Sequence, residues 1–357
     1  MDQAERIVGC LLGGAVGDAI GLPYEGLTRA AIGARVGAGP LGHALICGRG
    51  MLSDDSEHAC MTAQALLASG GELRRFTRSL AWRLRGWLLG LPASVGFGTL
   101  RALIRLWLGW SPERSGVNSA GNGPAMRAAI LGACLGADEV AMVAHVEAST
   151  RMTHRDPRAL AGALAVARAA GQIVHHGGAA ALAEVLAAVL RACPDPELRA
   201  ALELAREHHA RGEAPATFAA ALGQGAGVSG YIHHTVPVAL YCWLATPHDL
   251  RATVEQAVRL GGDTDTVAAI AGGLAGASVG AGAVPADWLA GLWEAPRSPR
   301  WLARLGRRLA GVVLAGRPGR PLRLCWPLLV ARNLVFTIVV LGHGLARVLR
   351  IGRHRAR

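Results

Sequence analysis

Two carboxylates and two hydroxyl groups occur together at positions 263 to 266, in the order Asp-Thr-Asp-Thr, directly after two glycines. The residues that follow, 267 to 277, are small and apolar, which predicts a close-packing helix that begins here. A single acid at a helix start is usually a cap that complements the helix dipole. A cap needs one oxygen, whereas Asp263, Asp265 and Thr266 offer three. This surplus favours a site for a hard cation such as Mg²⁺, Mn²⁺ or Ca²⁺.

A second acidic group, Ser53-Asp54-Asp55-Ser56, has the same arrangement, because residues 59 to 68 read as a helix that begins just after it. If the fold brings the two groups together, their four carboxylates repel one another, and two cations roughly 4 Å apart would neutralise them. All these ligands are oxygens, so the chemistry favours two divalent cations, Mg²⁺ or Mn²⁺. The predicted metal ligands are Ser53, Asp54, Asp55, Asp263, Asp265 and Thr266.

Four further segments could contact a substrate. Glu25 lies in a turn after an apolar helix, where a solvated loop acid is the simpler interpretation. Gly121-Asn122-Gly123 precedes a helix predicted through residues 125 to 129, and glycines there let backbone N–H groups reach a phosphate. His154 lies in a loop before a helix, where a structural role is the more common one. Tyr231 follows a glycine-rich loop and could stack on a base or simply pack.

Taken in order, these motifs resemble those of the ADP-ribosylglycohydrolase family. The resemblance covers about residues 7 to 283, and the ordered set is far more specific than any single motif. The matching segments are 13–21 with Glu25, 53–56, 121–127, 153–157, 230–231 and 262–266.

The resemblance implies metal-dependent hydrolysis of an ADP-ribosyl N- or O-glycosidic bond, which releases ADP-ribose from a modified protein or a related conjugate. It implies that Glu25 is the catalytic residue beside the scissile bond. Gly121, Asn122, Gly123, His154 and Tyr231 would bind the substrate. A non-catalytic ADP-ribose-binding sensor tethered to a membrane is the alternative, and the intact acidic set speaks against it. The group that carries the ADP-ribose cannot be identified from these residues.

The net charge of +12 is not spread evenly. Residues 297 to 357 hold 14 arginines and no acidic residue, whereas the preceding part holds 23 arginines and 25 acids and is therefore close to neutral. We expect no nucleic-acid binding by that body. The seven scattered cysteines form no Cys-x-x-Cys pair, and the first residues lack the charge pattern of a secretory signal, so we expect a cytoplasmic protein in a reducing compartment.

The periodicity predicts an all-α fold, and strand-like alternation is nowhere sustained. Residues 7 to 20 form an amphipathic helix with closely spaced glycines, and residues 72 to 114 form Arg- and Trp-rich helices whose arginines we expect in water. The uncharged stretch 266 to 284 is rich in Ala and Gly and is interpreted as a buried central helix. The resemblance implies a compact orthogonal helical catalytic domain, which we place at residues 1–295.

Residues 296–357 form an Arg-rich C-terminal appendix with an apolar run at residues 324 to 345. Arg332 and Asn333 interrupt this run, so the uninterrupted piece is short for a membrane span. Two alternatives remain: a helix that lies on an anionic membrane surface, on the inner face of the membrane, and a helical pair packed on the enzyme.

Overall fold

The chain is helical in the residues that the computed structural model describes, which are 1–93, 95–176 and 181–355 for the backbone and 1–93, 95–175 and 184–345 for the side chains. Within these residues there is no strand, and only isolated bridges link extended segments. The all-α prediction is therefore confirmed.

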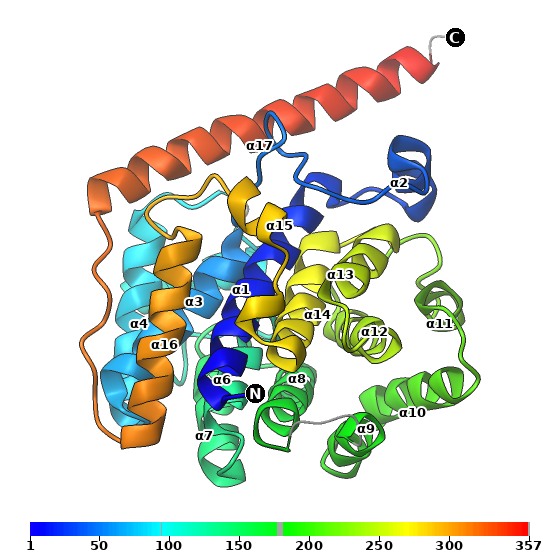
Figure 1. The fold of residues 1–357 in the computed structure, drawn as a ribbon. Helices are drawn as coiled ribbons and strands as arrows, with labels where there is room; N and C mark the ends of the chain where they lie inside the picture. Colours follow the sequence, from blue (N-terminus) through cyan, green and yellow to red (C-terminus); the bar gives the residue numbers. More distant parts are fainter. Residues whose placement is uncertain (94, 177–180, 356–357) are drawn as a thin grey trace.

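Figure 1 shows the arrangement of the helices, which are joined by short connections apart from the longer segments 37–53 and 108–124. The first eight are α1 (Gln3–Gly21), α2 (Arg29–Val36), α3 (Asp54–Ser69), α4 (Leu73–Leu89), α5 (Phe97–Trp107), α6 (Ala129–Leu135), α7 (Glu139–Arg151) and α8 (Pro157–His176). The others are α9 (Ala181–Arg191), α10 (Pro196–Ala210), α11 (Pro215–Ala221), α12 (Ile232–Ala245), α13 (Leu250–Arg259), α14 (Thr264–Val279), α15 (Ala286–Gly291), α16 (Pro299–Ala315) and α17 (Trp326–Arg355). Short 3-10 turns occupy Leu22–Tyr24, Ala125–Arg127 and Ala281–Ala283.

Helices α1 and α14 cross at the centre of the molecule with their backbones in contact. A Cβ atom placed on Gly17 would lie 2.1 Å from the carbonyl oxygen of Ala268, and one on Gly13 would lie 2.2 Å from that of Gly272. Only glycine therefore fits at these two positions of α1. Of the stretch 266 to 284 that was expected to form a buried central helix, the part up to Val279 does so, since α14 is buried from Thr264 to Ala277, and a 3-10 turn at Ala281–Ala283 follows.

The crossing brings the C-terminal end of α1 beside the N-terminal end of α14. The Thr264 hydroxyl donates a hydrogen bond of 2.9 Å to the carbonyl of Gly21, which ties the two ends together. Helix α3 begins close by, because Ser53 caps its first turn and bonds to Asp18 of α1. Three helix ends that are far apart in the sequence therefore meet at one point.

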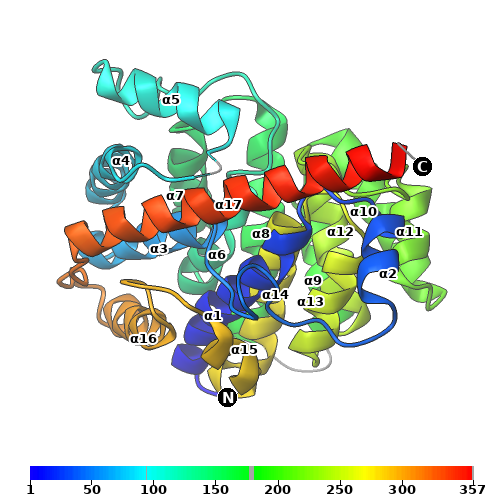
Figure 2. The same cartoon turned by 90° about the horizontal axis from the view of Figure 1, so that it is seen from above.

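Helix α16 packs on α1 and α3, and this packing crosses the boundary expected at residue 295. Leu302, Leu305 and Leu309 are buried in the main core, and Gly306 lies directly against Val8 of α1. Residues 299 to 315 are therefore packed into the catalytic body. Helix α17 crosses over the outside of the molecule, as Figures 1 and 2 show, and it packs on the body through the buried Leu329 and Phe336. Its outer face is exposed, so of the two C-terminal helices α16 is the more deeply packed.

The segment after Pro124 differs from the continuous helix expected over residues 125 to 129. Ala125–Arg127 is a 3-10 turn, and α6 begins at Ala129. The carbonyl of Asn122 accepts from the backbone N–H groups of both Ala125 and Met126, at 2.8 and 3.3 Å, so the chain is wound tightly there. This winding points Arg127 into the interior, where it is buried.

Candidate active site

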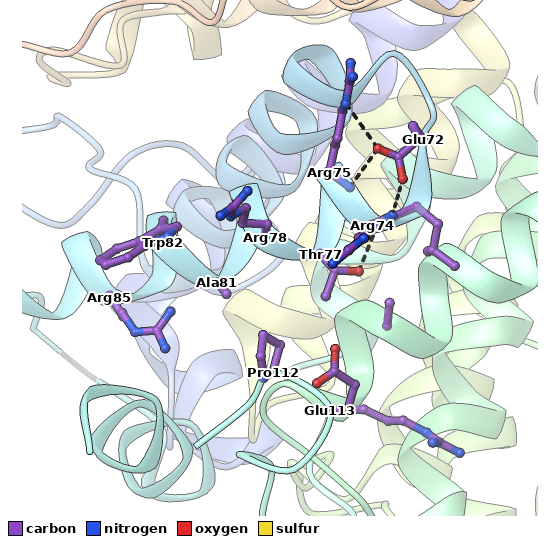
Figure 3. A pocket seen from close by; sticks show the side chains of 13 residues that line it. Glu72, Arg74, Arg75, Thr77, Arg78, Ala81, Trp82, Arg85, Pro112 and Glu113 are labelled. Carbon is purple, nitrogen blue, oxygen red and sulfur yellow. Dashed lines mark hydrogen bonds and ion pairs between the residues drawn. The ribbon is translucent and has the colours of Figure 1, made fainter. Parts of the chain in front are cut away.

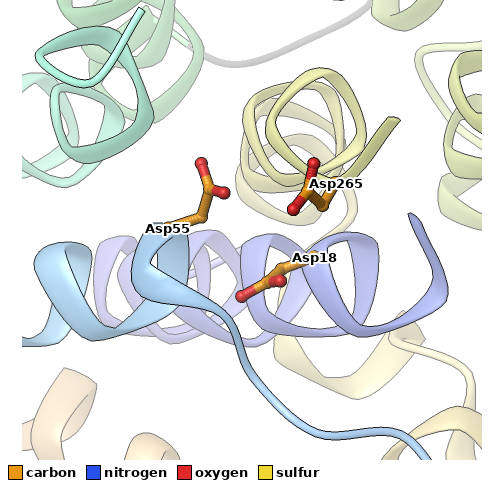
Figure 4. Close-up of side chains that lie close together, drawn as sticks. All are labelled: Asp18, Asp55 and Asp265. Carbon is orange, nitrogen blue, oxygen red and sulfur yellow. The ribbon is translucent and has the colours of Figure 1, made fainter. Parts of the chain in front are cut away.

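Three aspartates from three different helices converge at the meeting point of the helix ends. Asp18 comes from α1, Asp55 from α3 and Asp265 from α14, and Figure 4 shows their carboxyl groups facing one another. Each offers an oxygen, and these oxygens all lie within 4.8 Å of one another. All three side chains are buried. Three carboxylates at this spacing form a potential ligand set for a hard cation.

Asp18 also fixes the start of α3. Its carboxylate accepts hydrogen bonds from the backbone N–H of Ser53 at 3.1 and 3.0 Å and from the N–H of Ser56 at 3.2 Å. The Ser56 hydroxyl donates to it as well, at 2.5 Å. The free N–H groups of the helix end are thus satisfied by a carboxylate from another helix, which complements the helix dipole.

Among the described residues, one carboxylate oxygen of Asp55 accepts hydrogen bonds and the other does not. Its Oδ2 accepts from the hydroxyls of Ser53 and Thr266, at 3.1 and 3.2 Å. Its Oδ1 is buried and has no hydrogen-bond partner among the described residues. A buried carboxylate oxygen without a partner is costly. The donor set and this unpaired oxygen therefore fit a divalent cation.

The electrostatics of the three carboxylates lead to the same conclusion. Burial raises the pKa of Asp18 to about 6, although the hydrogen bonds from Ser56 and Ser53 act in the opposite direction. Burial and the neighbouring charges of Asp54, Asp18 and Asp263 raise the pKa of Asp55. Burial and the charge of Glu25 raise the pKa of Asp265. A positive charge at this point would relieve the repulsion.

Asp54 and Asp263, the other two predicted ligands, lie beside this group and outside the set of three. Both are half-buried, Asp54 as the first residue of α3 and Asp263 as the N-cap of α14. Asp18, in contrast, was not among the residues predicted as ligands. A signal was present, because Asp18 is the only charged residue between positions 7 and 24.

Glu25 lies at the edge of this site. It is exposed and follows the 3-10 turn at the end of α1. Burial raises the pKa of both Asp54 and Asp265, and the charge of Glu25 adds to the rise. The N–H of Gly26 bonds to the carbonyl of Gly262 at 2.7 Å, which attaches this turn to the loop that carries Asp263. The Glu25 carboxylate is therefore within electrostatic reach of the buried cluster while it remains accessible to water.

Asn122 connects the predicted substrate loop to the acidic loop. Its side-chain N–H groups donate to Asp263 at 2.6 Å and to the Thr235 hydroxyl at 2.9 Å. Its backbone N–H bonds to the carbonyl of Gly230 at 3.1 Å. Isolated β-bridges, such as the one between Gly121 and Tyr231, also join these loops. The loops around residues 122, 230 and 262 thus form one connected surface beside the aspartates.

His154 is buried against the same loop. A Cβ atom on Gly121 or Gly123 would lie 3.3 or 3.2 Å from its ring, so the glycines make room for the imidazole. Burial and the nearby charge of Arg127 lower the pKa of His154 to about 3. The ring is therefore neutral at physiological pH, which suits positioning or binding and does not suit acid catalysis.

Arg127 holds this region together from the interior, and sequence reasoning assigned it no role. Its guanidinium donates to the Ser149 hydroxyl and carbonyl, both at 2.9 Å, and to the Thr153 hydroxyl at 2.7 Å. It also bonds to the Gly123 carbonyl at 3.2 Å and lies 3.0 Å from a ring nitrogen of His58. A buried arginine with this number of partners stabilises the loop geometry.

Tyr231 contacts the neighbouring helix α10. Its hydroxyl donates to the carboxylate of Glu197, with both oxygens at 3.0 Å, and the Arg158 guanidinium lies 5.8 Å from the ring centre. The residue is half-buried at the N-cap of α12. Its place beside Gly230 and Asn122 is as expected for a binding residue, and that role stays a prediction.

A groove of about 940 Å³ lies away from these residues, along α4. Figure 3 shows its lining, which includes Arg74, Arg75, Arg78, Arg85 and Trp82. The Arg75 side chain is 69% exposed and pairs with the neighbouring Glu72. This exposure is consistent with the interpretation of these arginines as a solvated helix face.

Comparison with known proteins places the chain in a family. The family model described as ADP-ribosylglycohydrolase matches residues 1–318. The ADP-ribosyl-(dinitrogen reductase) glycohydrolase of Rhodospirillum rubrum is 30% identical over 306 residues, which cover 81% of this chain and 90% of that protein. An uncharacterised protein of Archaeoglobus fulgidus is 31% identical over 296 residues, covering 81% of this chain and 92% of its own length.

The fold is also similar to a solved structure. A chain titled as an ADP-ribosylglycohydrolase-related protein complex superimposes with a TM-score of 0.65 at 27% identity, covering 87% of this chain and 99% of that one. The matched region includes every residue of the acidic cluster and of the loops around it. The chain therefore belongs to the ADP-ribosylglycohydrolase family.

Proposed function

We propose that this protein hydrolyses an ADP-ribosyl N- or O-glycosidic bond with the help of two divalent cations, Mg²⁺ or Mn²⁺, and releases ADP-ribose from a modified protein or a small conjugate. Family membership supports the reaction class. The observation that carries the metal dependence is the buried group of Asp18, Asp55 and Asp265 with the unpaired Oδ1 of Asp55.

The cations would be held by Asp55 and Asp265 together with Asp18. The two ligand sets would be completed by Asp54, Asp263, Ser53 and Thr266. Bound there, the cations would supply positive charge that grips ribose hydroxyl groups and offsets the carboxylate repulsion.

Glu25 would carry out the proton transfer. It lies at the exposed edge of the site, where it can orient a water molecule and take its proton. Positive charge builds at the anomeric carbon as the bond breaks, and the surrounding carboxylates stabilise it. Because the pKa of His154 is about 3, that residue remains neutral and does not compete for this role.

The connected loops would hold the rest of the substrate. Gly121, Asn122 and Gly123 would border the diphosphate, and the backbone N–H of Gly123 could reach it. The N–H groups of Gly121 and Asn122 already bond to the Ser119 hydroxyl and the Gly230 carbonyl. Asn122 also keeps this loop in register with Asp263. His154 would support the loop by packing against Gly121 and Gly123, and Tyr231 would border the bound nucleoside. We propose a cytoplasmic location, which the seven free cysteines support.

A turnover assay tests the proposal. The purified chain is presented with ADP-ribose linked to arginine, to serine, to an acetyl ester and to a nucleic-acid end, with Mg²⁺, with Mn²⁺ and with excess chelator. We expect turnover of at least one conjugate, its loss in chelator and its recovery on adding the metal back. Full activity in chelator would refute the metal dependence.

Two variants separate the roles of the carboxylates. Asp55→Asn should lose both metal binding and turnover, whereas Glu25→Gln should lose turnover but still bind ADP-ribose in calorimetry. Glu113→Gln, at an exposed acid away from the site, is the matched control and should behave as the native enzyme. Binding of ADP-ribose by the native chain without turnover of any conjugate would favour the sensor alternative.

A further inference from the structure

Helix α17 has an unusual distribution of polar and apolar residues. Its inner face, which contacts the body, carries Arg332 and Asn333, both buried. Arg332 lies 2.7 Å from the Glu294 carboxylate, and the Asn333 side chain donates to the Gly90 carbonyl at 2.7 Å. The half-buried His343 bonds to the carbonyl of Leu45 at 2.5 Å. Polar interactions, together with the buried Leu329 and Phe336, therefore attach this helix to the enzyme.

The opposite face of α17 is apolar and exposed. Leu334, Ile338, Leu341 and Leu345 are 51%, 70%, 67% and 62% exposed. They recur every three or four residues and so form one stripe along the helix. A surface helix of a soluble protein normally buries its apolar face and exposes its polar one. Helix α17 instead carries apolar residues on both faces, since Leu329 and Phe336 are buried on the inner one, and its exposed outer stripe is therefore a contact surface for an apolar partner.

The apolar surface continues beyond the helix. Leu89 and Leu91, on either side of the Gly90 that binds Asn333, are both more than half exposed, and Phe97 is 74% exposed. Figure 2 shows α17 passing near α4, which ends at Leu89, whereas α5 stands apart from it. Leu89 and Leu91 thus extend the exposed apolar surface of α17 at the point where Asn333 binds Gly90.

Positive charge borders the stripe at both ends. Arg323 closely precedes α17 and is exposed, and the sequence after residue 345 contains Arg347, Arg350, Arg353, Arg355 and Arg357. No acidic residue occurs from position 297 onward. An apolar stripe between two positive ends is complementary to an anionic lipid surface, where headgroups lie next to acyl chains. Two copies joined stripe to stripe would instead bring these positive ends together.

We propose that α17 lies in the plane of an anionic membrane surface, with its Leu334–Leu345 stripe toward the lipid and its inner face, which carries Arg332 and Asn333, on the enzyme. The segment Trp326–Leu345 is long and apolar enough to cross a membrane, and so is Gln3–Tyr24, of which 94% is buried in the body. Crossing by α17 would require Arg332 to leave Glu294, so that both charges lose their partner. The polar attachment of the inner face therefore keeps the helix parallel to the surface.

Sedimentation with vesicles tests this surface. The full chain is mixed with vesicles of phosphatidylcholine alone and of phosphatidylcholine with phosphatidylglycerol, at low and at high salt. We expect the phosphatidylglycerol vesicles to bind at least roughly tenfold more protein at low salt, and high salt or an alkaline wash to release it. Equal binding to both vesicles, or binding that survives the alkaline wash, would overturn the proposal.

Variants connect the binding to the stripe. The triple variant Leu334→Ser, Ile338→Ser, Leu341→Ser should lose binding without loss of the fold, because all three side chains point outward. Val140→Ser is the matched control, since this residue is 81% exposed on α7, across the molecule from α17 in Figure 1. Arg323→Gln with Arg347→Gln and Arg350→Gln should weaken binding at low salt.

Gel filtration of the same proteins separates lipid from a second copy of the chain. We expect a monomer whose elution the triple serine variant does not change. A native dimer that this variant dissociates, together with no vesicle binding, would show that the stripe is a subunit interface and would overturn the proposal. Turnover in solution should be unchanged by the triple variant, so failure of membrane binding is distinct from failure of the proposed function.

Discussion

The guanidinium of Arg297 lies 2.6 Å from the carboxylate of Glu57, and both side chains are buried. Glu57 is two residues after Asp55 in the first turn of α3, and the Trp87 side chain donates to it at 2.5 Å. Arg332 of α17 approaches the same carboxylate at 3.8 Å. The C-terminal segment therefore neutralises a charge directly behind the proposed metal ligands.

We expect Glu57→Ala to destabilise the protein strongly, because Arg297 would then be buried without a partner. Removing one member of a buried pair typically costs about 3–5 kcal/mol. Denaturant unfolding measures the change. The double variant Glu57→Met, Arg297→Met is the control, since removing both charges should restore much of the stability. A loss below about 1 kcal/mol in Glu57→Ala would contradict the role given to this pair.

A chain that ends at Ala295 should not fold, because it lacks the leucines of α16 that pack on α1 and α3. A chain that ends at Gly319 keeps α16, but Glu294 loses Arg332. With Glu294→Gln to remove the unpaired charge, we expect this longer chain to be folded and soluble. Thermal unfolding by circular dichroism distinguishes the two chains. A folded, active 1–295 chain would show instead that the domain ends there.

Asp18→Asn should weaken Mn²⁺ binding by at least roughly tenfold, because the variant removes one of three converging charges. Calorimetric titration with Mn²⁺ measures this effect. Since Asp18 also accepts hydrogen bonds from Ser53 and Ser56, the unfolding free energy is followed in the same samples. Loss of stability with unchanged Mn²⁺ affinity would show that Asp18 only positions α3.

Gly17→Ala should destabilise the crossing of α1 and α14, because its Cβ would lie 2.1 Å from the Ala268 carbonyl oxygen. Forcing an extra group into a packed core costs about 1–3 kcal/mol. Gly86→Ala in α4 is the control, since a Cβ there meets nothing within 4 Å. That change should be neutral or stabilising by about 0.5–1 kcal/mol. Equal effects of the two changes would contradict the tight crossing.

Stability should fall in mild acid partly because of His154. The folded chain holds the pKa of this residue at about 3, through burial and then Arg127, whereas the unfolded imidazole titrates near its usual value of about 6.5. Between these values the unfolded chain binds more protons, so the stability present above pH 6.5 is lost as the pH falls. At pH 5 the loss is about 2 kcal/mol.

The variant His154→Gln isolates this effect. Unfolding is measured in urea at pH 7 and pH 5, with chelator present so that metal binding does not contribute. Between these pH values the free energy of unfolding of the native chain should fall by about 2 kcal/mol more than that of the variant. His248→Gln, at an exposed position, should show the native pH dependence. Identical acid sensitivity of the native chain and His154→Gln would refute the assignment.

Much of the fold could be predicted because its signals are local. Helical periodicity and small residues indicate α1 and α14, and the acids at positions 54, 55, 263 and 265 mark two helix starts. Asp18 was harder to identify as a site residue, because it lies inside an apolar helix and its role depends on where that helix ends in space. The hydrogen bonds from Ser53 and Ser56 that reveal it are tertiary.

The C-terminal segment shows a second limit of sequence reasoning. Its arginines and prolines predict an appendix, and nothing local indicates that Arg297 and Arg332 pair with Glu57 and Glu294 in the interior. Arg127 is a similar case, since an arginine in a predicted helix is normally solvated, whereas in this fold a 3-10 turn points it inward. Such pairings depend on partners that are distant in the sequence.

The glycine crossing of α1 and α14 also bears on how such a chain can diverge. Asp18 follows Gly17 directly, and Asp265 lies in the first turn of the helix that Gly17 contacts, so the distance between the two carboxylates is set by backbone against backbone. Changes in the size of surrounding core side chains alter the packing around this contact and leave the contact itself in place. The spacing of the two aspartates therefore tolerates such changes. It depends instead on a few positions where no side chain fits.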